Sequence, residues 1–278
     1  MTTILIRYAE IGLKGTTVRT RFENRLMDNI LTMLATDGVE AMVNRGEARF
    51  FVETEDVDRA VASLRRVFGI ASLSVAEVAG AGMEEICAAA AEYSKGRIAP
   101  GQSFAVRARR EGSHAYTSMD VGREAGSAIF EANEGLKVDL TRPDKVFYIE
   151  IRNNRAYIFD TYIRCHAGLP LGSQGRVLAD VDDDRGILSA WLMMKRGCKV
   201  IVRSDRDCPV LRRYDPELKV IDAGQDVPRR VHGIVLGTAL ADLEGVDVAA
   251  YDLPVFFPTI GMTDAEVDAR MRIVLETD

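Results

Sequence analysis

The stretch FAVRARREGSHAYTSMDVGREAGSAIF, residues 104–130, predicts a strand, a loop and a helix in that order. Its first residues alternate, with apolar side chains on one face and Arg107 and Arg109 on the other, as in a half-buried strand. Thr117 and Asp120 have the spacing of a helix N-terminus, where a hydroxyl and a carboxylate cap the first backbone N–H groups. The helix behind them carries its apolar residues on one side, at Val121, Ala125, Ala128 and Ile129.

The flanking sequence completes a unit that we place at residues 76–165. An alanine-rich helix is predicted before the strand, at Met83–Ser94. Three strands are predicted after the second helix, KVDL, VFYIEIR and RAYIFDTYI, with a turn at Asn153 and Asn154 between the last two. This mixture of strands and helices indicates an α+β domain.

Residues 1–75 predict a second, smaller α+β unit. ILIRYAEI (residues 4–11) alternates like a strand, and apolar residues then recur at helical spacing up to Gly38. EAMVNRGEARFFVET reads as a hairpin with its turn at residues 44–46, and a second apolar helical stripe ends at Gly69. SLSVAEV returns as a strand, so the order suggests a ferredoxin-like sandwich.

A third unit follows a Gly- and Pro-rich segment, CHAGLPLGSQG, in which we place a linker at residues 166–175. Residues 176–278 alternate strands such as RVLAD, CKVIVRS and GIVLGT with helices, and Thr263 and Glu266 fit a capping box for the last helix. Alternation of this kind predicts an α/β domain with a parallel, doubly wound sheet.

Composition excludes some classes of protein. No apolar run has the length of a membrane span, and the N-terminus enters directly into a strand pattern, which leaves no room for a signal peptide. The four cysteines form no CxxC pair, so neither a disulfide framework nor a zinc ribbon is expected. We therefore expect a cytoplasmic protein.

The net charge of −6 is distributed unevenly along the chain. Residues 1–72 carry ten basic and ten acidic residues, residues 73–174 carry twelve and thirteen, and residues 175–278 carry fourteen and nineteen. The acidic excess thus lies in the third unit. The near-neutral first two units can still bind phosphates if their basic residues gather on one face.

Several stretches resemble the tRNA 4-thiouridine sulfurtransferases. RYAEIGLKG (residues 7–15) is similar to their opening, and residues 104–130 with KVDLTRPD and YIEIRNNRAYIF are similar to their THUMP domain. GLPLGSQGRV, AWLMMKRGCKV and DLPVFFPTIGMTDAEV resemble the start and end of their PP-loop ATP-pyrophosphatase domain. The resemblance implies a tRNA-binding ferredoxin-like and THUMP module, followed by a Rossmann-like PP-loop domain that activates a uridine with ATP.

The ATP site departs from the family pattern. A PP-loop needs Ser-Gly-Gly-x-Asp-Ser after its first strand, because small residues let backbone N–H groups close around pyrophosphate. Here carboxylates replace the glycines, in the loop Asp182, Asp183, Asp184, Arg185 and Gly186. The third unit is also short and lacks the middle of the family's catalytic domain. We therefore expect a degenerate, truncated PP-loop domain with a vestigial site.

Basic and aromatic residues of the first two units are candidates for RNA binding, because cations pair with phosphates and rings stack on unpaired bases. They suit the 3′ end of tRNA, where both groups lie together: Arg7, Lys14, Arg21, Arg25, Arg107, Arg109, Arg110, His114 and Tyr116. The alternative for the arginines is a solvated face with surface ion pairs. Gly122 and Gly126 could admit an RNA backbone or pack closely on a strand.

We assign no catalytic residue and no metal site. For Asp182, Asp183 and Asp184 a solvated acidic loop is a commoner outcome than a divalent metal site. Cys198 is expected in the core, whereas Cys208 is expected to be exposed, with Asp207 disfavouring its thiolate. No two cysteines match a sulfur-carrying pair.

The sequence therefore predicts a tRNA-binding THUMP protein that assists tRNA thiolation, without a cofactor and without membrane contact. Two alternatives stay open. One is an active tRNA sulfurtransferase that uses ATP and magnesium. The other is a scaffold whose acidic third unit docks a separate tRNA-modifying enzyme. The sequence also leaves open whether the chain forms a homodimer.

Overall fold

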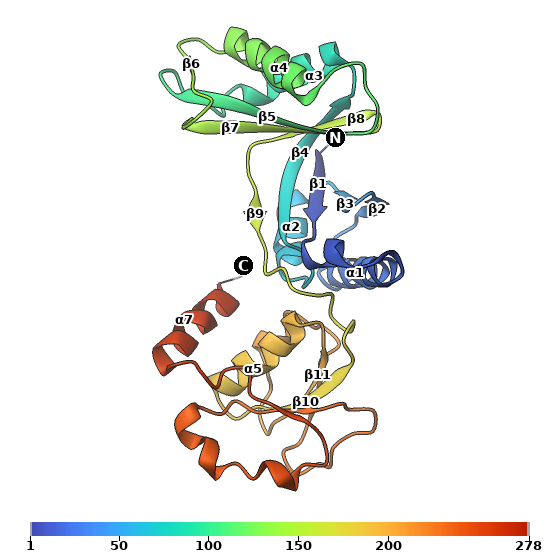
Figure 1. The fold of residues 1–278 in the computed structure, drawn as a ribbon, viewed down its shortest axis with the longest axis vertical. Coiled ribbons are helices and arrows are strands. Elements are labelled where there is room, and N and C mark those ends of the chain that lie inside the picture. Colours follow the sequence, from blue (N-terminus) through green and yellow to red (C-terminus); the bar gives the residue numbers. More distant parts are fainter. Residues whose placement is uncertain (1, 277–278) are drawn as a thin grey trace.

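The computed structural model describes residues 2–276, which form three domains in a row (Figure 1). The first domain lies in the middle, the second at one end and the third at the other. Within the described part of the chain, no helix is long and apolar enough to cross a membrane.

The first domain has the predicted ferredoxin-like pattern. Its elements are β1 (Thr2–Arg7), η1 (Glu10–Leu13), α1 (Thr16–Thr36), β2 (Met42–Gly46), β3 (Arg49–Glu53), α2 (Val57–Arg65) and β4 (Ser72–Gly80). The strands pair antiparallel in the order β2-β3-β1-β4. The core lies between this sheet and the two helices, and Ile4, Leu26 and Leu64 are fully buried in it.

The hairpin turn lies later than the sequence indicated. Residues 44–46 belong to β2, Gly46 pairs with Arg49, and the turn is formed by Glu47 and Ala48, where Ala48 adopts a φ of 53°. Gly46 instead makes room for the ring of Phe51, because a Cβ at this position would stand 2.7 Å from that ring. The prediction was wrong because this glycine is required by packing and not by the turn.

The second domain stacks two helices on one face of its sheet (Figure 1). Its elements are α3 (Met83–Ser94), β5 (Ser103–Glu111), α4 (Ser118–Ala132), β6 (Lys137–Val138), β7 (Lys145–Arg152) and β8 (Arg155–Phe159), followed by β9 (Ile163–Arg164). The capping box of Thr117 and Asp120 is confirmed. So is the turn at Asn153, which has a φ of 52°.

A single strand joins the sheets of the first two domains. β4 pairs with β1 from Ser72 to Glu77 and with β8 from Glu77 to Gly80. The described residues therefore build one nine-stranded sheet, ordered β2-β3-β1-β4-β8-β7-β5-β6 with β9 beside β4. The boundary expected at residue 75 falls inside β4.

The third domain is a parallel α/β sheet, as predicted. Its elements are β10 (Arg176–Asp180), α5 (Asp184–Lys195), β11 (Lys199–Arg203), α6 (Pro209–Arg212), β12 (Lys219–Ile221), β13 (Ile234–Val235), η2 (Leu240–Gly245), η3 (Val248–Ala250), β14 (Val255–Phe256) and α7 (Asp264–Leu275). The strands are parallel in the order β12-β11-β10-β13-β14. Thr263 and Glu266 form the predicted capping box of α7.

The segment expected to be a linker packs between the first and third domains. Leu169 and Leu171 are buried, and the amide of Asn29 on α1 donates to the carbonyl oxygen of Leu171 at 3.2 Å. Next to them, Phe68 stacks on Tyr214 with ring centroids 5.3 Å apart. The third domain is therefore held against the first by packed side chains.

Candidate nucleic-acid interface

A groove of about 880 Å³ runs beside β5 in the second domain, between that strand and α4. β5 pairs with β7 from Phe104 to Glu111, but with β6 only at Ser103 and Phe104. Among the described residues, the outer edge of β5 therefore has no strand partner beyond Phe104.

The groove combines cations with apolar and aromatic side chains. Arg107, Arg109 and Arg123 line it, and the Arg107 guanidinium donates to the carbonyl oxygen of Leu140 at 2.5 Å. Its remaining lining includes solvent-exposed apolar residues and two tyrosines, Met119, Phe130, Val138, Leu140, Tyr148 and Tyr162. The exposure of Arg107 and Arg109 agrees with the predicted polar face of the strand.

Gly122 and Gly126 line the same groove from α4. A Cβ on Gly122 would lie 3.8 Å from the carbonyl oxygen of Val106, and one on Gly126 would lie 3.9 Å from its Cγ2. Both distances are ordinary van der Waals contacts. Packing of α4 on β5 therefore does not require glycine at either position.

Three other candidates lie together at the far end of β5. The rings of His114 and Tyr116 stack at 5.3 Å, and Arg110 donates to the carbonyl oxygen of Gly112 at 3.1 Å. A ring nitrogen of His114, Nε2, lies 2.8 Å from the carbonyl oxygen of Asn153, and the Tyr116 hydroxyl donates to the carbonyl of Ala81. These contacts tie the loop between β5 and α4 to the rest of the domain.

A separate basic group lies on the first domain. Lys14, Arg21 and Arg25 are exposed, the last two being one turn apart on α1. Arg19 behaves differently, because its Nε donates to Glu23 at 2.9 Å and it also contacts the Tyr8 hydroxyl. The structure therefore places these candidates in three groups: the groove, the end of β5, and α1 together with Lys14 just before it.

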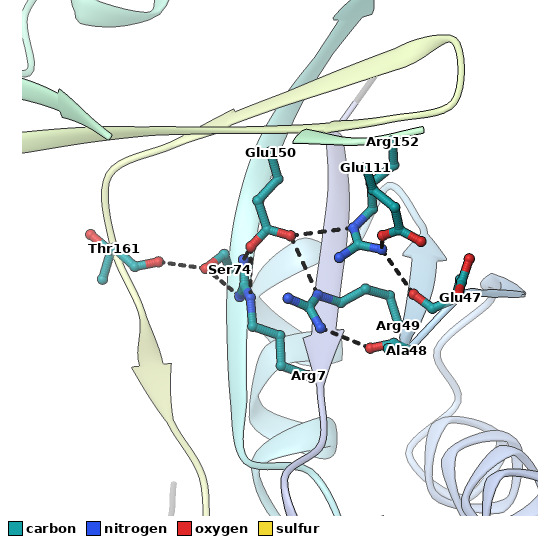
Figure 2. A network of polar contacts seen from close by, with 9 residues as sticks. All are labelled: Arg7, Glu47, Ala48, Arg49, Ser74, Glu111, Glu150, Arg152 and Thr161. Atoms are coloured by element: carbon teal, nitrogen blue, oxygen red, sulfur yellow. Dashed lines mark hydrogen bonds and ion pairs between the residues drawn. The ribbon is translucent and has the colours of Figure 1, made fainter. Parts of the chain in front are cut away.

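Arg7 does not join these groups, since only 8% of its surface is exposed. Figure 2 shows its guanidinium pointing at Glu150, to which it donates from Nε and Nη2 at 3.0 and 2.7 Å. Nη1 donates to Ser74 at 2.9 Å, and the group lies 4.5 Å from the ring centroid of Tyr162. All of its polar atoms are used inside the protein, so we leave Arg7 out of the proposed RNA surface.

Glu150 is the centre of a buried network that sequence reasoning missed. Arg7 from β1, Arg49 from β3 and Arg152 from β7 all pair with its carboxylate (Figure 2). Burial would raise the pKa of Glu150, but the three guanidinium groups outweigh it and hold this pKa below its ordinary value. Partners so far apart in the chain leave no periodicity or spacing that could reveal them.

The loop corresponding to the PP-loop lies between β10 and α5, as predicted. The Asp183 carboxylate accepts a hydrogen bond from the backbone N–H of Gly186 at 2.7 Å and so caps α5. Arg185 is buried and donates to the carbonyl oxygens of Thr259 and Met262, each at 3.0 Å. The chain after β13 lies directly on this turn, because a Cβ on Gly237 would stand 2.4 Å from the Gly186 nitrogen.

The cysteines correct one expectation. Cys198 is buried as predicted, but Cys208, expected to be exposed, has only 3% of its surface exposed, because α6 and its neighbours cover it. Burial, together with the adjacent Asp207 carboxylate, raises the pKa of the Cys208 thiol. A protonated, buried thiol is a poor nucleophile.

Comparison with known proteins identifies the first two domains. The model of the ThiI ferredoxin-like domain matches residues 3–74, and that of the THUMP domain matches residues 80–160. A probable tRNA sulfurtransferase of Methanosarcina acetivorans is 39% identical over 203 residues, which cover 71% of this chain and 49% of that protein. One from Aeropyrum pernix is 41% identical over 203 residues, covering 71% and 50%. The chain thus spans about half the length of these curated relatives.

Two solved structures match the whole chain. PH1313 from Pyrococcus horikoshii Ot3 has a TM-score of 0.86 and 29% identity, and the match covers 99% of each chain. A 4-thiouridine synthetase, solved in complex with RNA and bound ATP, has a TM-score of 0.81 and 21% identity, covering 100% of this chain and 85% of that one. Both domain models match in order along residues 3–160, so the chain contains a ThiI ferredoxin-like domain followed by a THUMP domain.

Proposed function

We propose that this chain binds tRNA in the cytoplasm through its first two domains and takes part in tRNA thiolation. The observation that carries the proposal is the groove beside β5, which lies within the THUMP domain and combines cations with exposed apolar and aromatic surface. The relatives named as probable tRNA sulfurtransferases support the thiolation context.

The groove suits unpaired nucleotides better than a duplex. Arg107 and Arg109 can pair with phosphates, and side chains such as Phe130 and Tyr162 offer surfaces on which bases stack. Gly122 and Gly126 leave backbone accessible on the opposite wall, which supports the view that they admit a ligand. The single-stranded 3′ end of tRNA has both phosphates and unpaired bases, and we propose it as the occupant.

We further propose that the third domain does not bind ATP in the manner of a PP-loop enzyme. Pyrophosphate needs free backbone N–H groups at the helix N-terminus. Here Asp183 already accepts from Gly186, and the backbone at Gly237 stands against the same turn. These residues do not fit a pyrophosphate group, and three neighbouring carboxylates would repel one. The proposed role is therefore binding, with catalysis supplied by another protein.

A second candidate function is an active tRNA sulfurtransferase that uses ATP and magnesium. It is favoured by the similarity in fold, over the whole chain, to the 4-thiouridine synthetase solved with RNA and ATP. Rearrangement of the chain at Gly237 would be needed before the first turn of α5 could accept phosphate.

Binding of purified protein to labelled tRNA tests the proposal. We expect saturable binding that weakens as salt increases, because cations that contact phosphates displace condensed counterions. Removing the single-stranded 3′ nucleotides from the same tRNA should lower the affinity at least tenfold. The proposal fails if tRNA binds no more tightly than duplex DNA of equal length.

A further inference from the structure

The third domain contains a basic cleft to which the proposed function assigns no role. It has a volume of about 480 Å³ and lies where the parallel strands begin, lined by Arg176, Lys199 and Lys219. Arg176 is the first residue of β10, and it is the register partner of Lys199, the first residue of β11. The cleft is thus at the edge of the sheet opposite the loop after β10 that holds Asp183.

The acidic residues of this cleft are already paired with one of its lysines. Lys199 Nζ contacts the Asp215 carboxylate at 2.7 Å and the Glu217 carboxylate at 3.2 Å. Arg176, Lys219 and Arg229 are exposed, and within residues 2–276 none of the three forms an ion pair. The cleft therefore presents uncompensated positive charge in a domain whose net charge is −5.

The cleft is continuous with the basic surface of the first domain. Gly172 lies between the two: a Cβ on it would stand 3.6 Å from Cγ of Lys199 and 3.7 Å from Nε of Arg25. Arg25 shares one face of α1 with Arg21, and the chain passes beneath α1 on its way to β10 (Figure 1). Cations thus extend from α1 across Gly172 into the third domain.

We propose that Arg176, Lys219 and Arg229 form a second contact surface for RNA, which takes the phosphodiester backbone that continues from α1. This inference rests on the proposed function and adds the third domain to the tRNA-binding surface. The ligand is the backbone of RNA, since the cleft is lined by cations and offers few of the rings on which unpaired bases stack. It explains how a domain of acidic net charge can lie next to a bound polyanion.

The test uses the full chain with Arg176→Ala, Lys219→Ala and Arg229→Ala combined. A matched control combines Arg206→Ala, Arg270→Ala and Arg272→Ala, which removes the same charge from exposed sites of the same domain. The affinity for tRNA is measured as a function of salt, and thermal unfolding is measured for each protein. We expect the cleft variant to bind at least tenfold more weakly and its log–log salt slope to fall by about two, at roughly 0.7–0.9 per lost phosphate contact. The control should bind like the wild type.

Four outcomes would count against the inference. If both variants bind tRNA equally weakly, the effect is due to net charge alone and the inference is overturned. Saturable binding of inorganic phosphate that only the cleft variant loses, with tRNA affinity unchanged, would assign the cleft to a small anion. Absence of tRNA binding by the wild-type protein would overturn the proposed function and this inference with it. If the wild-type protein binds tRNA and the cleft variant binds it equally well, this inference alone is overturned.

Discussion

Arg7 and Glu150 pair at 2.7 Å across the junction of the first two domains, although 143 residues separate them in the sequence. Ser74 on β4, the strand shared by both domains, completes the contact. Glu150 also lines the groove beside β5. The ion pair between the two domains therefore borders the proposed RNA site.

Glu150→Gln should destabilise the protein strongly. Gln keeps the volume but leaves Arg7 and Arg49 without a compensating charge, while Arg152 retains its pair with Glu111, and such a loss costs about 3–5 kcal/mol. The free energy of unfolding by urea measures it. The control is Glu124→Gln, which breaks an exposed pair with Arg123 and should cost less than about 1 kcal/mol. Equal losses in the two variants would contradict the role given to Glu150.

Arg107→Ala combined with Arg109→Ala should weaken tRNA binding by several kcal/mol at most, since hydrogen bonds to charged groups contribute about 1.5–3 kcal/mol each. Stability should change little, because both side chains are exposed and the hydrogen bond of Arg107 is to a backbone carbonyl, that of Leu140. Filter binding and thermal unfolding measure the two effects, with Arg206→Ala and Arg270→Ala combined as the control. Unchanged tRNA affinity with lowered stability would give these arginines a structural role instead.

Local patterns predicted the elements of this fold well. The helices capped by Thr117 and by Thr263 follow from hydroxyl and carboxylate spacing, which is a property of a few adjacent residues. The alternation of strands and helices after residue 176 likewise predicted the parallel sheet. The hairpin turn failed, because nothing local distinguishes a glycine needed by a turn from one that makes room for Phe51.

The candidate site was less predictable for the same reason. Arg107 and Arg109 could be found because strand alternation marks their face as polar. Arg7 was misjudged, since its burial depends on Glu150 and Tyr162, which reach it only after the chain has folded. The edge of β5 lacks a strand partner beyond Phe104 because β6 is short. The sequence of β5 itself does not indicate the length of β6.

Asp183→Ala should destabilise α5 without creating or abolishing nucleotide binding. Loss of the cap to the Gly186 N–H costs about 0.5–2 kcal/mol. Calorimetric titration of the wild type with Mg-ATP, with and without tRNA, should show no saturable heat in the micromolar range. Asp226→Ala removes an exposed carboxylate elsewhere in the domain and serves as the control. Micromolar ATP binding that disappears in Asp183→Ala but persists in Asp226→Ala would favour the active sulfurtransferase over the binding role.

The contact between the first and third domains contains a histidine whose protonation is unfavourable. His166 packs among Phe68, Trp191 and Tyr214, and its Nε2 lies 3.3 Å from the Tyr214 hydroxyl. Burial, followed by the charges of Lys195 and Arg65, lowers the pKa of His166 from its usual 6.5 to about 4. The neutral ring is therefore the form that fits this contact.

Acidification should weaken that contact in a defined window. The pKa of His166 is lower in the folded protein, so the unfolded chain binds the additional proton between pH 6.5 and 4. The stabilisation is complete above pH 6.5 and decreases as the pH falls, by up to about 2 kcal/mol at pH 5. His166→Phe keeps an aromatic ring but cannot titrate. Unfolding free energies of both proteins at pH 7.5 and pH 5 give the comparison, in which carboxylate effects cancel. The wild type should lose more stability than the variant, and parallel losses would show that His166 does not sense pH at this contact.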